Sequence, residues 1–288
     1  MISLAHLSPR PHLGFRNILE IILPRLAANL STMFTDLPFL ERFVAAADAG
    51  FGAVEFMFPY DWPADVIGKA ATENGLEIVL FNCPAGDWAD GERGIAAHPE
   101  RIESCREGIG RARKYARALS CGKLHLMAGI VPPDGDRAAM EATFIDNVRY
   151  AADLVADDGI EIMLEPINSR IDIPGYLHTT TDEAMALLER IDRTNVRLQY
   201  DVYHMQIMEG DLVRHLDALM ERIGHVQIAD NPGRAEPGTV EINFETILRR
   251  LDALRYSGHV GCEYKPASDT VTGLAWAAPY LNRRGRNA

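Results

Sequence analysis

Short apolar segments alternate with longer amphipathic segments along the chain after Pro24. The short segments predict buried strands, and the longer ones place apolar residues at helical spacing. The predicted strands are Arg25–Ser31, Ala53–Phe58, Glu77–Asn82, Lys123–Gly129, Glu161–Ile167, Val196–Tyr203, His225–Ala229 and Val260–Tyr264. The predicted helices are Leu37–Ala49, Ala64–Asn74, Pro99–Ala118, Arg137–Ala156, Thr181–Ile191, Leu212–Ile223, Phe244–Leu254 and Gly273–Leu281.

Turn and cap residues fit this alternation. Gly50 and Gly75 stand where glycines end helices, and Thr181-Asp182 and Asn243 can cap helix starts. Strands that are separated by helices must be parallel, and eight such units favour a closed (β/α)8 barrel, the TIM barrel of the α/β class. A doubly wound open sheet is the alternative, but no Gly-x-Gly-x-x-Gly motif follows the first predicted strand.

The chain divides into a short extension and one domain. Residues 25–288 form the predicted barrel, and no linker or shift in composition interrupts them. Residues 1–24 contain a short apolar stretch, Ile18–Leu23, that ends at Pro24-Arg25. A secretory signal has a longer apolar core followed by small residues, so we interpret residues 1–24 as an N-terminal extension and expect it to be poorly ordered.

Composition excludes several classes of function. The net charge is −12 and the pI is near 5.2, whereas nucleic-acid binding needs a basic patch, so no nucleic-acid partner is expected. The four cysteines form no Cys-x-x-Cys pair, and a reducing, cytoplasmic compartment is expected. No apolar run reaches the roughly 18 residues that span a bilayer, so no membrane association is expected.

Oxygen ligands stand at the ends of the later strands. Glu165, Asp201 and Glu263 lie in or directly after apolar runs, and Gln227 lies on the strand between the last two. Strands five to eight are neighbours in a barrel, so these side chains can converge. Their hard oxygen donors suit Mg²⁺ or Mn²⁺ better than Zn²⁺.

Two glutamates in one buried site also predict proton chemistry. A carboxylate with a raised pKa can remove a proton next to a carbonyl, and a second can return it to the neighbouring carbon. A metal ion would stabilise the enediolate between these steps. The predicted reaction is therefore a 1,2-proton shift between an aldehyde and a ketone, catalysed by Glu165 and Glu263.

Several sequence stretches resemble the hydroxypyruvate isomerase family, within the xylose-isomerase-like barrel superfamily. The resemblance runs from about Arg25 to Tyr280. It rests on AANLSTMF, GAVEFMFPYD, PAGDWADGERGIA, LEPIN, DIPGY, QYDVYHMQ, GHVQIADNPGRAEPGTVEIN and GCEYKP. One departure is an apparent extra residue between Asn168 and Asp172, which puts a substrate contact from Asp172 in doubt.

The resemblance implies interconversion of hydroxypyruvate and tartronate semialdehyde (2-hydroxy-3-oxopropanoate), in glyoxylate and carbohydrate metabolism. It implies Glu165 and Glu263 as the proton donor and acceptor, and a metal set of Glu165, Asp201, Gln227 and Glu263. The expected cofactor is Mg²⁺, with Mn²⁺ as the alternative and a strict requirement left open. The expected partner is a small anionic keto acid, with homo-oligomerisation also left open.

Other polar residues were assigned by position. The predicted substrate-binding residues are His204, Arg234 and Lys265. Arg234 is expected to bind the carboxylate of the substrate. Lys265 is expected either to do the same or to form a salt bridge with Glu55 or Glu165. His225 is predicted to serve packing and hydrogen bonding. Arg93 and Trp88, in the long third loop, are candidates to close over the substrate or to pack within the loop.

Two other reactions could use the same residues. A 2-oxo-tetronate isomerase would differ by one carbon in its substrate, worth only about 1–3 kcal/mol in a pocket. A metal-dependent ketose 3-epimerase would act on longer neutral sugars and would not need a carboxylate-binding arginine. Metal-dependent hydrolysis of DNA is disfavoured by the acidic chain and the small number of histidines at the site.

Overall fold

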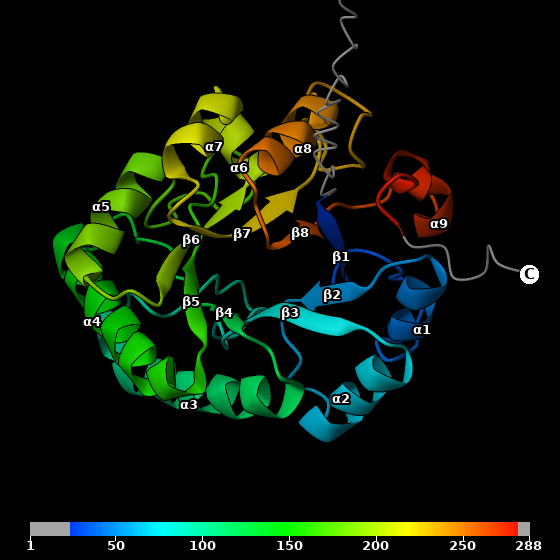
Figure 1. Ribbon diagram of the computed structural model, residues 1–288. Coiled ribbons are helices and arrows are strands. Elements are labelled where there is room, and N and C mark those ends of the chain that lie inside the picture. Colours follow the sequence, from blue (N-terminus) through cyan, green and yellow to red (C-terminus); the bar gives the residue numbers. More distant parts are fainter. Residues whose placement is uncertain (1–23, 282–288) are drawn as a thin grey trace, which may run out of the picture.

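Eight parallel strands close into a barrel in the computed structural model, which describes residues 24–281 (Figure 1). The predicted extension, residues 1–24, lies outside the described residues except for Pro24. The strands are β1 (Arg25–Asn29), β2 (Ala53–Phe56), β3 (Glu77–Asn82), β4 (Lys123–His125), β5 (Glu161–Leu164), β6 (Val196–Asp201), β7 (Ile223–Ile228) and β8 (His259–Cys262). The predicted α/β TIM barrel is therefore confirmed.

The helices form a ring outside the strands, so the main core lies between the two layers (Figure 1). They are α1 (Glu41–Asp48), α2 (Ala64–Glu73), α3 (Ile102–Leu119), α4 (Arg137–Val155), α5 (Thr181–Ile191), α6 (Val202–Met208), α7 (Leu212–Leu219), α8 (Phe244–Ala253) and α9 (Thr270–Gly273). Among the described residues there are also three 3₁₀ turns: η1 (Pro99–Arg101), η2 (Ala156–Asp158) and η3 (Leu274–Ala277). Within residues 24–281, no helix has the length and apolar character needed to span a membrane.

Some predicted boundaries were wrong for local reasons. The sixth strand ends at Asp201 rather than at Tyr203, because the Asp201 carboxylate accepts a hydrogen bond from the Tyr203 N–H (2.8 Å) and starts α6. The fourth strand ends at His125, beyond which Ala128 pairs with Gly94 of the long third loop. The cap of α5 is Thr180, one residue before the predicted position.

The last predicted helix is also shorter than expected. In place of one helix over Gly273–Leu281, the chain forms α9 and the turn η3. Pro279 lies in this stretch and has no backbone N–H to continue a helix. The Asn243 cap and the helix-ending glycines Gly50 and Gly75, both with positive φ, are confirmed.

A buried aspartate organises the loop between β7 and α8. Both carboxylate oxygens of Asp230 accept backbone N–H groups, from Asn231 (2.9 Å) and Ile242 (3.0 Å) on one and from Gly238 (3.0 Å) and Val240 (2.9 Å) on the other. One buried carboxylate thus ties four backbone N–H groups of the loop together. This loop extends over the barrel mouth and carries one of the predicted substrate-binding residues.

We expect Asp230→Ala to lower the free energy of unfolding by about 2–4 kcal/mol, because four backbone donors, including the buried Ile242 N–H, lose their acceptor. Urea unfolding followed by circular dichroism measures the change. Asp134→Ala, in an exposed loop, is the matched control and should leave stability within about 0.5 kcal/mol of wild type. Equal stability of the two variants would contradict the assigned role of Asp230.

Candidate active site

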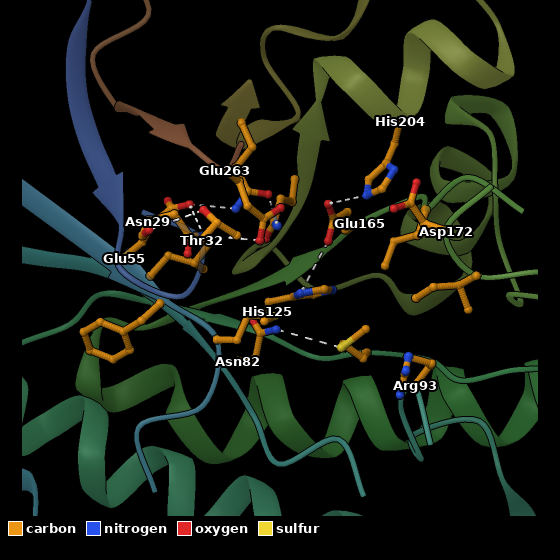
Figure 2. Close-up of a pocket in the computed structure, with 18 of the residues that line it drawn as sticks. Asn29, Thr32, Glu55, Asn82, Arg93, His125, Glu165, Asp172, His204 and Glu263 are labelled. Carbon is orange, nitrogen blue, oxygen red and sulfur yellow. Dashed lines mark hydrogen bonds and ion pairs between the residues drawn. The ribbon is translucent and has the colours of Figure 1, made fainter. Parts of the chain in front are cut away.

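A cavity of about 330 Å³ opens where the strands end at the carboxyl side of the barrel (Figure 2). Every strand, or the residue directly after it, contributes a polar side chain to its lining. In chain order these residues are Asn29, Glu55, Asn82, His125, Glu165, Gln199, Gln227 and Glu263. This end of a TIM barrel is where its enzymes carry out their chemistry.

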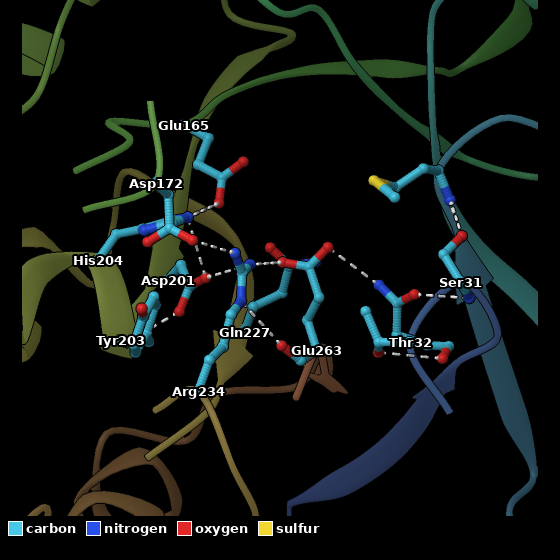
Figure 3. A network of polar contacts seen from close by, with 12 residues as sticks. Ser31, Thr32, Glu165, Asp172, Asp201, Tyr203, His204, Gln227, Arg234 and Glu263 are labelled. Atoms are coloured by element: carbon cyan, nitrogen blue, oxygen red, sulfur yellow. Dashed lines mark hydrogen bonds and ion pairs between the residues drawn. The ribbon is translucent and has the colours of Figure 1, made fainter. Parts of the chain in front are cut away.

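Three of the four predicted metal ligands are carboxylates, and they lie close together in the structure. Glu165 follows β5, Asp201 ends β6 and Glu263 follows β8, and the side chains are 6%, 0% and 12% exposed. Figure 3 shows them around the guanidinium of Arg234. The Arg234 Nη2 lies 2.6 Å from Glu263 Oε2 and 3.7 Å from Asp201 Oδ2.

Burial changes the acidity of all three groups. Desolvation, with Glu263 and Asp201 nearby, raises the pKa of Glu165 well above its ordinary value. Desolvation also raises the pKa of Glu263 to about 7 and that of Asp201 to about 6, although Arg234 opposes both shifts. Near neutral pH the site therefore holds carboxyl groups that can either accept or donate a proton.

Arg234 is in the cavity, but its charge is already engaged. Besides Glu263 and Asp201, it pairs with Asp172, whose Oδ1 lies 3.2 Å from Nη1. Its guanidinium also lies over the Tyr203 ring, 5.1 Å from the centroid. The apparent extra residue before Asp172 therefore does not remove this side chain from the site.

His204 lies in α6 and contacts two of the carboxylates. Its Nε2 is 3.7 Å from Glu165 Oε1 and 3.5 Å from Asp201 Oδ2, while its Nδ1 is 2.7 Å from Asn168 Nδ2. Desolvation lowers the pKa of His204 well below its ordinary value, so the ring is neutral near pH 7. The facing atoms Glu165 Oε1 and Asp201 Oδ2 are buried and have no hydrogen-bond partner among the described residues.

The fourth predicted ligand, Gln227, has both ends of its amide in hydrogen bonds to other side chains. Its Oε1 accepts a hydrogen bond from Gln199 Nε2 (2.6 Å), and its Nε2 donates to Glu55 Oε1 (2.8 Å). The predicted role of His225 in packing and hydrogen bonding agrees with its position, since its Nε2 lies 2.7 Å from Glu55 Oε2. His225 is thus among the partners of Glu55, and Lys265 is not.

Lys265 lies at the rim of the cavity and is exposed. Its backbone N–H donates to the Arg234 carbonyl (2.7 Å), and no salt bridge of its ammonium group is found among the described residues. The alternative pairing with Glu55 or Glu165 is therefore wrong. Arg93 and Trp88 also line the cavity, with the guanidinium 4.2 Å from the ring centroid.

No role was predicted from the sequence for several polar residues of the site, among them His125 and Asn168. His125 of β4 places Nδ1 3.5 Å from Glu165 Oε2, and burial lowers its pKa to about 3. Asn168 holds the loop after β5, where its Oδ1 accepts the N–H groups of Ile171 and Asp172. A histidine within an apolar strand is a signal that could have pointed to His125.

Comparisons with known proteins agree with this arrangement. The family described as xylose isomerase-like TIM barrel matches residues 43–280. The chain belongs to this family. The 2-oxo-tetronate isomerase of Pectobacterium atrosepticum is 48% identical over 262 residues, which cover 91% of this chain and 100% of that protein. The hydroxypyruvate isomerase of Escherichia coli is 46% identical over 256 residues, which cover 89% and 99%.

A solved structure is similar over the same region. It is described as an AP endonuclease of family 2 from Brucella melitensis, with 50% identity and a TM-score of 0.88, covering 90% of this chain and 100% of that one. Family membership and the curated relatives together show that the chain is an enzyme, an isomerase of the type to which these relatives belong.

The raised pKa of Glu263 gives a pH-dependent stability. The pKa is about 7 in the fold against an ordinary 4.5, so its contribution to stability is full below pH 4.5 and is lost as the pH rises through 7. We expect the stability of the metal-free wild type relative to Glu263→Gln to fall over this range by on the order of 2 kcal/mol.

Urea unfolding at several pH values measures this difference. Buried histidines such as His125, whose pKa is lowered, favour the opposite trend. They are present in both proteins, so their effect cancels. A difference that stays flat or increases with pH would contradict the raised pKa.

Proposed function

We propose that the enzyme interconverts hydroxypyruvate and tartronate semialdehyde by a 1,2-proton shift. The observation that carries the proposal is the pair Glu165 and Glu263, two largely buried carboxyl groups with raised pKa values that line one small cavity. Identity of 46% to a hydroxypyruvate isomerase over nearly the whole length supports the choice of substrate.

The two carboxyl groups divide the proton transfer between them. One, as carboxylate, removes a proton from C3 of hydroxypyruvate, and C2 of the resulting enediolate accepts a proton from the other, as carboxylic acid. The hydroxyl proton on O3 passes to O2 in the same conversion, which leaves an aldehyde at C3 and a hydroxyl group at C2. Like charges in one buried site disfavour double ionisation, so one ionised and one protonated member is the natural state of the pair. The reaction needs no external oxidant or reductant, because only the positions of hydrogen atoms change.

A divalent cation, Mg²⁺ or Mn²⁺, fits the donor set of Glu165, Asp201, Gln227 and Glu263. The unpartnered buried oxygens of Glu165 and Asp201 support this assignment, and ligand atoms of these two residues and His204 lie within 4.8 Å of one another. When bound, the cation would supply positive charge to the oxygens of the enediolate. The neutral His204 ring is placed to hydrogen-bond a substrate oxygen or to join the ligands.

The substrate carboxylate needs a positive charge that is not already paired. Arg234 pairs with Asp172 and Glu263, whereas Arg93 and Lys265 line the cavity with no carboxylate partner among the described residues. We assign the substrate carboxylate to Arg93 and Lys265, with Arg234 oriented toward the reacting carbons. The stacking of Arg93 on Trp88 keeps its side chain over the cavity.

A 2-oxo-tetronate is the second candidate substrate, favoured by a relative of that name at 48% identity. The same carboxylates would move the proton, and a cavity of about 330 Å³ accepts three or four carbons. Endonuclease activity, suggested by the description of the Brucella structure, does not fit a chain of net charge −12.

Side-by-side kinetics on hydroxypyruvate and a 2-oxo-tetronate test the proposed substrate. We expect the kcat/KM for hydroxypyruvate to be higher by about 10-fold or more, the factor that a methylene-sized difference provides. Equal values, or a preference for the four-carbon acid, would assign the chain to the second candidate. Turnover of neither acid would contradict the proposed reaction.

Variants of the two glutamates test the mechanism. Glu165→Gln and Glu263→Gln should each lower kcat by about 10²–10⁴-fold while the far-UV circular dichroism stays unchanged. One of the two variants keeps the carboxylate that removes the C3 proton of hydroxypyruvate. In D₂O this variant should exchange the C3 hydrogen for deuterium without forming product, whereas the other variant should show no exchange. Near-normal turnover in either variant would rule out the two-carboxylate mechanism.

A further inference from the structure

Another buried carboxylate lines the same cavity and has no part in the proposed proton shift. Glu55, in the middle of β2, is 1% exposed and is contacted by three side chains from other strands. Its oxygens lie 2.7 Å from His225 Nε2, 2.8 Å from Gln227 Nε2 and 3.0 Å from Asn29 Nδ2. An interior strand is expected to be apolar, so a carboxylate with three partners indicates a specific function.

Strand β8, which is separated from β2 by β1, leaves room for this carboxylate. Gly261 of β8 pairs with Gln227 of β7, and a Cβ atom at Gly261 would lie only 2.3 Å from an oxygen of Glu55. Any larger residue would displace the carboxyl group. The glycine therefore permits Glu55 to extend across the barrel interior.

Glu55 determines which way the Gln227 amide points. A carboxylate offers only acceptor atoms, so Gln227 must direct its Nε2 toward Glu55. Its Oε1 then points away, where Gln199 Nε2 is the donor at 2.6 Å. An amide oxygen has two lone pairs, so one remains for a cation.

The same carboxylate orients Asn29. The Asn29 Nδ2 donates to both Glu55 Oε1 (3.0 Å) and Glu263 Oε1 (3.2 Å), and its Oδ1 accepts the Ser31 N–H (2.9 Å). With both ends of the amide fixed, a hydrogen-bond donor always faces Glu263. Figure 2 shows Glu55, Asn29 and Glu263 in this order along the cavity wall.

We propose that Glu55 is a positioning residue of this isomerase: it holds the Gln227 oxygen available to a divalent cation and keeps the Asn29 donor on Glu263. The inference rests on the proposed function, because it requires the cation and the catalytic role of Glu263. Glu55 does not contact the substrate in this scheme and acts only through the two amides.

Titration of the metal-free protein with Mn²⁺ by isothermal calorimetry tests the proposal. We expect Glu55→Gln to weaken Mn²⁺ binding by about 10–100-fold and to lower kcat more than it changes KM. Should this variant fail to fold, Gly261→Ala offers a second route, because its methyl group displaces the same carboxylate. Glu209→Gln is the matched control: Glu209 accepts two hydrogen bonds from Thr181, away from the cavity, and its replacement should leave Mn²⁺ affinity unchanged.

A double-mutant cycle separates positioning from a general structural role. If Glu55 acts through Gln227, Glu55→Gln should change Mn²⁺ affinity by less than about 3-fold when Gln227→Ala is already present. An equal loss in both backgrounds, or wild-type affinity in Glu55→Gln, would overturn the inference alone. Failure of the wild-type protein to bind Mn²⁺ would overturn both the inference and the cation in the proposed function.

Discussion

Three acidic side chains share one buried space, and their mutual repulsion is the constraint around which the site is arranged. Glu165, Asp201 and Glu263 arrive from three different strands, and their side chains are only 6%, 0% and 12% exposed. Burying charge is costly unless it is compensated. In the described chain the compensation comes from Arg234, and the loop that carries this guanidinium is in turn held by the four backbone hydrogen bonds to Asp230.

The same constraint explains why the site suits an isomerase. Incomplete compensation leaves the pKa values of Glu263 and Asp201 near 7 and 6, the range in which a carboxyl group both accepts and donates a proton. The nearby histidines act in the opposite sense: burial lowers the pKa values of His125 and His204, so they remain neutral and add no further charge. The chemistry of the site therefore follows from burial as much as from residue type.

The sequence was sufficient to predict the barrel and to identify charged residues that interrupt an otherwise apolar strand. A glutamate such as Glu165, at the end of an apolar strand, is conspicuous, and the parallel order of the strands places it beside Glu263. Contacts across the barrel interior could not be inferred in this way. The pairing of Glu55 with His225 joins residues 170 positions apart, and side-chain length and the presence of Gly261 decide it.

Local capping was a further limit of the sequence interpretation. Asp201 begins a helix in the structure, although the apolar run continues to Tyr203 and predicted a strand there. The residue is both a member of the acidic cluster and a helix cap, and pattern alone indicates only the first role. Likewise, the sequence pattern does not indicate the contact between Arg234 and Asp172, because the two residues lie in different loops.

The hydrogen bond between Asn29 and Glu263 joins residues 234 positions apart, one at the end of the first strand and one directly after the last. These two strands also pair with each other, in register from Arg25 with His259 to Ala28 with Cys262. During synthesis on the ribosome, nearly the whole barrel must emerge before this pair can form. The hydrogen bond that holds Glu263 therefore forms in the same step that closes the sheet, and a chain that has not closed also lacks the assembled cavity.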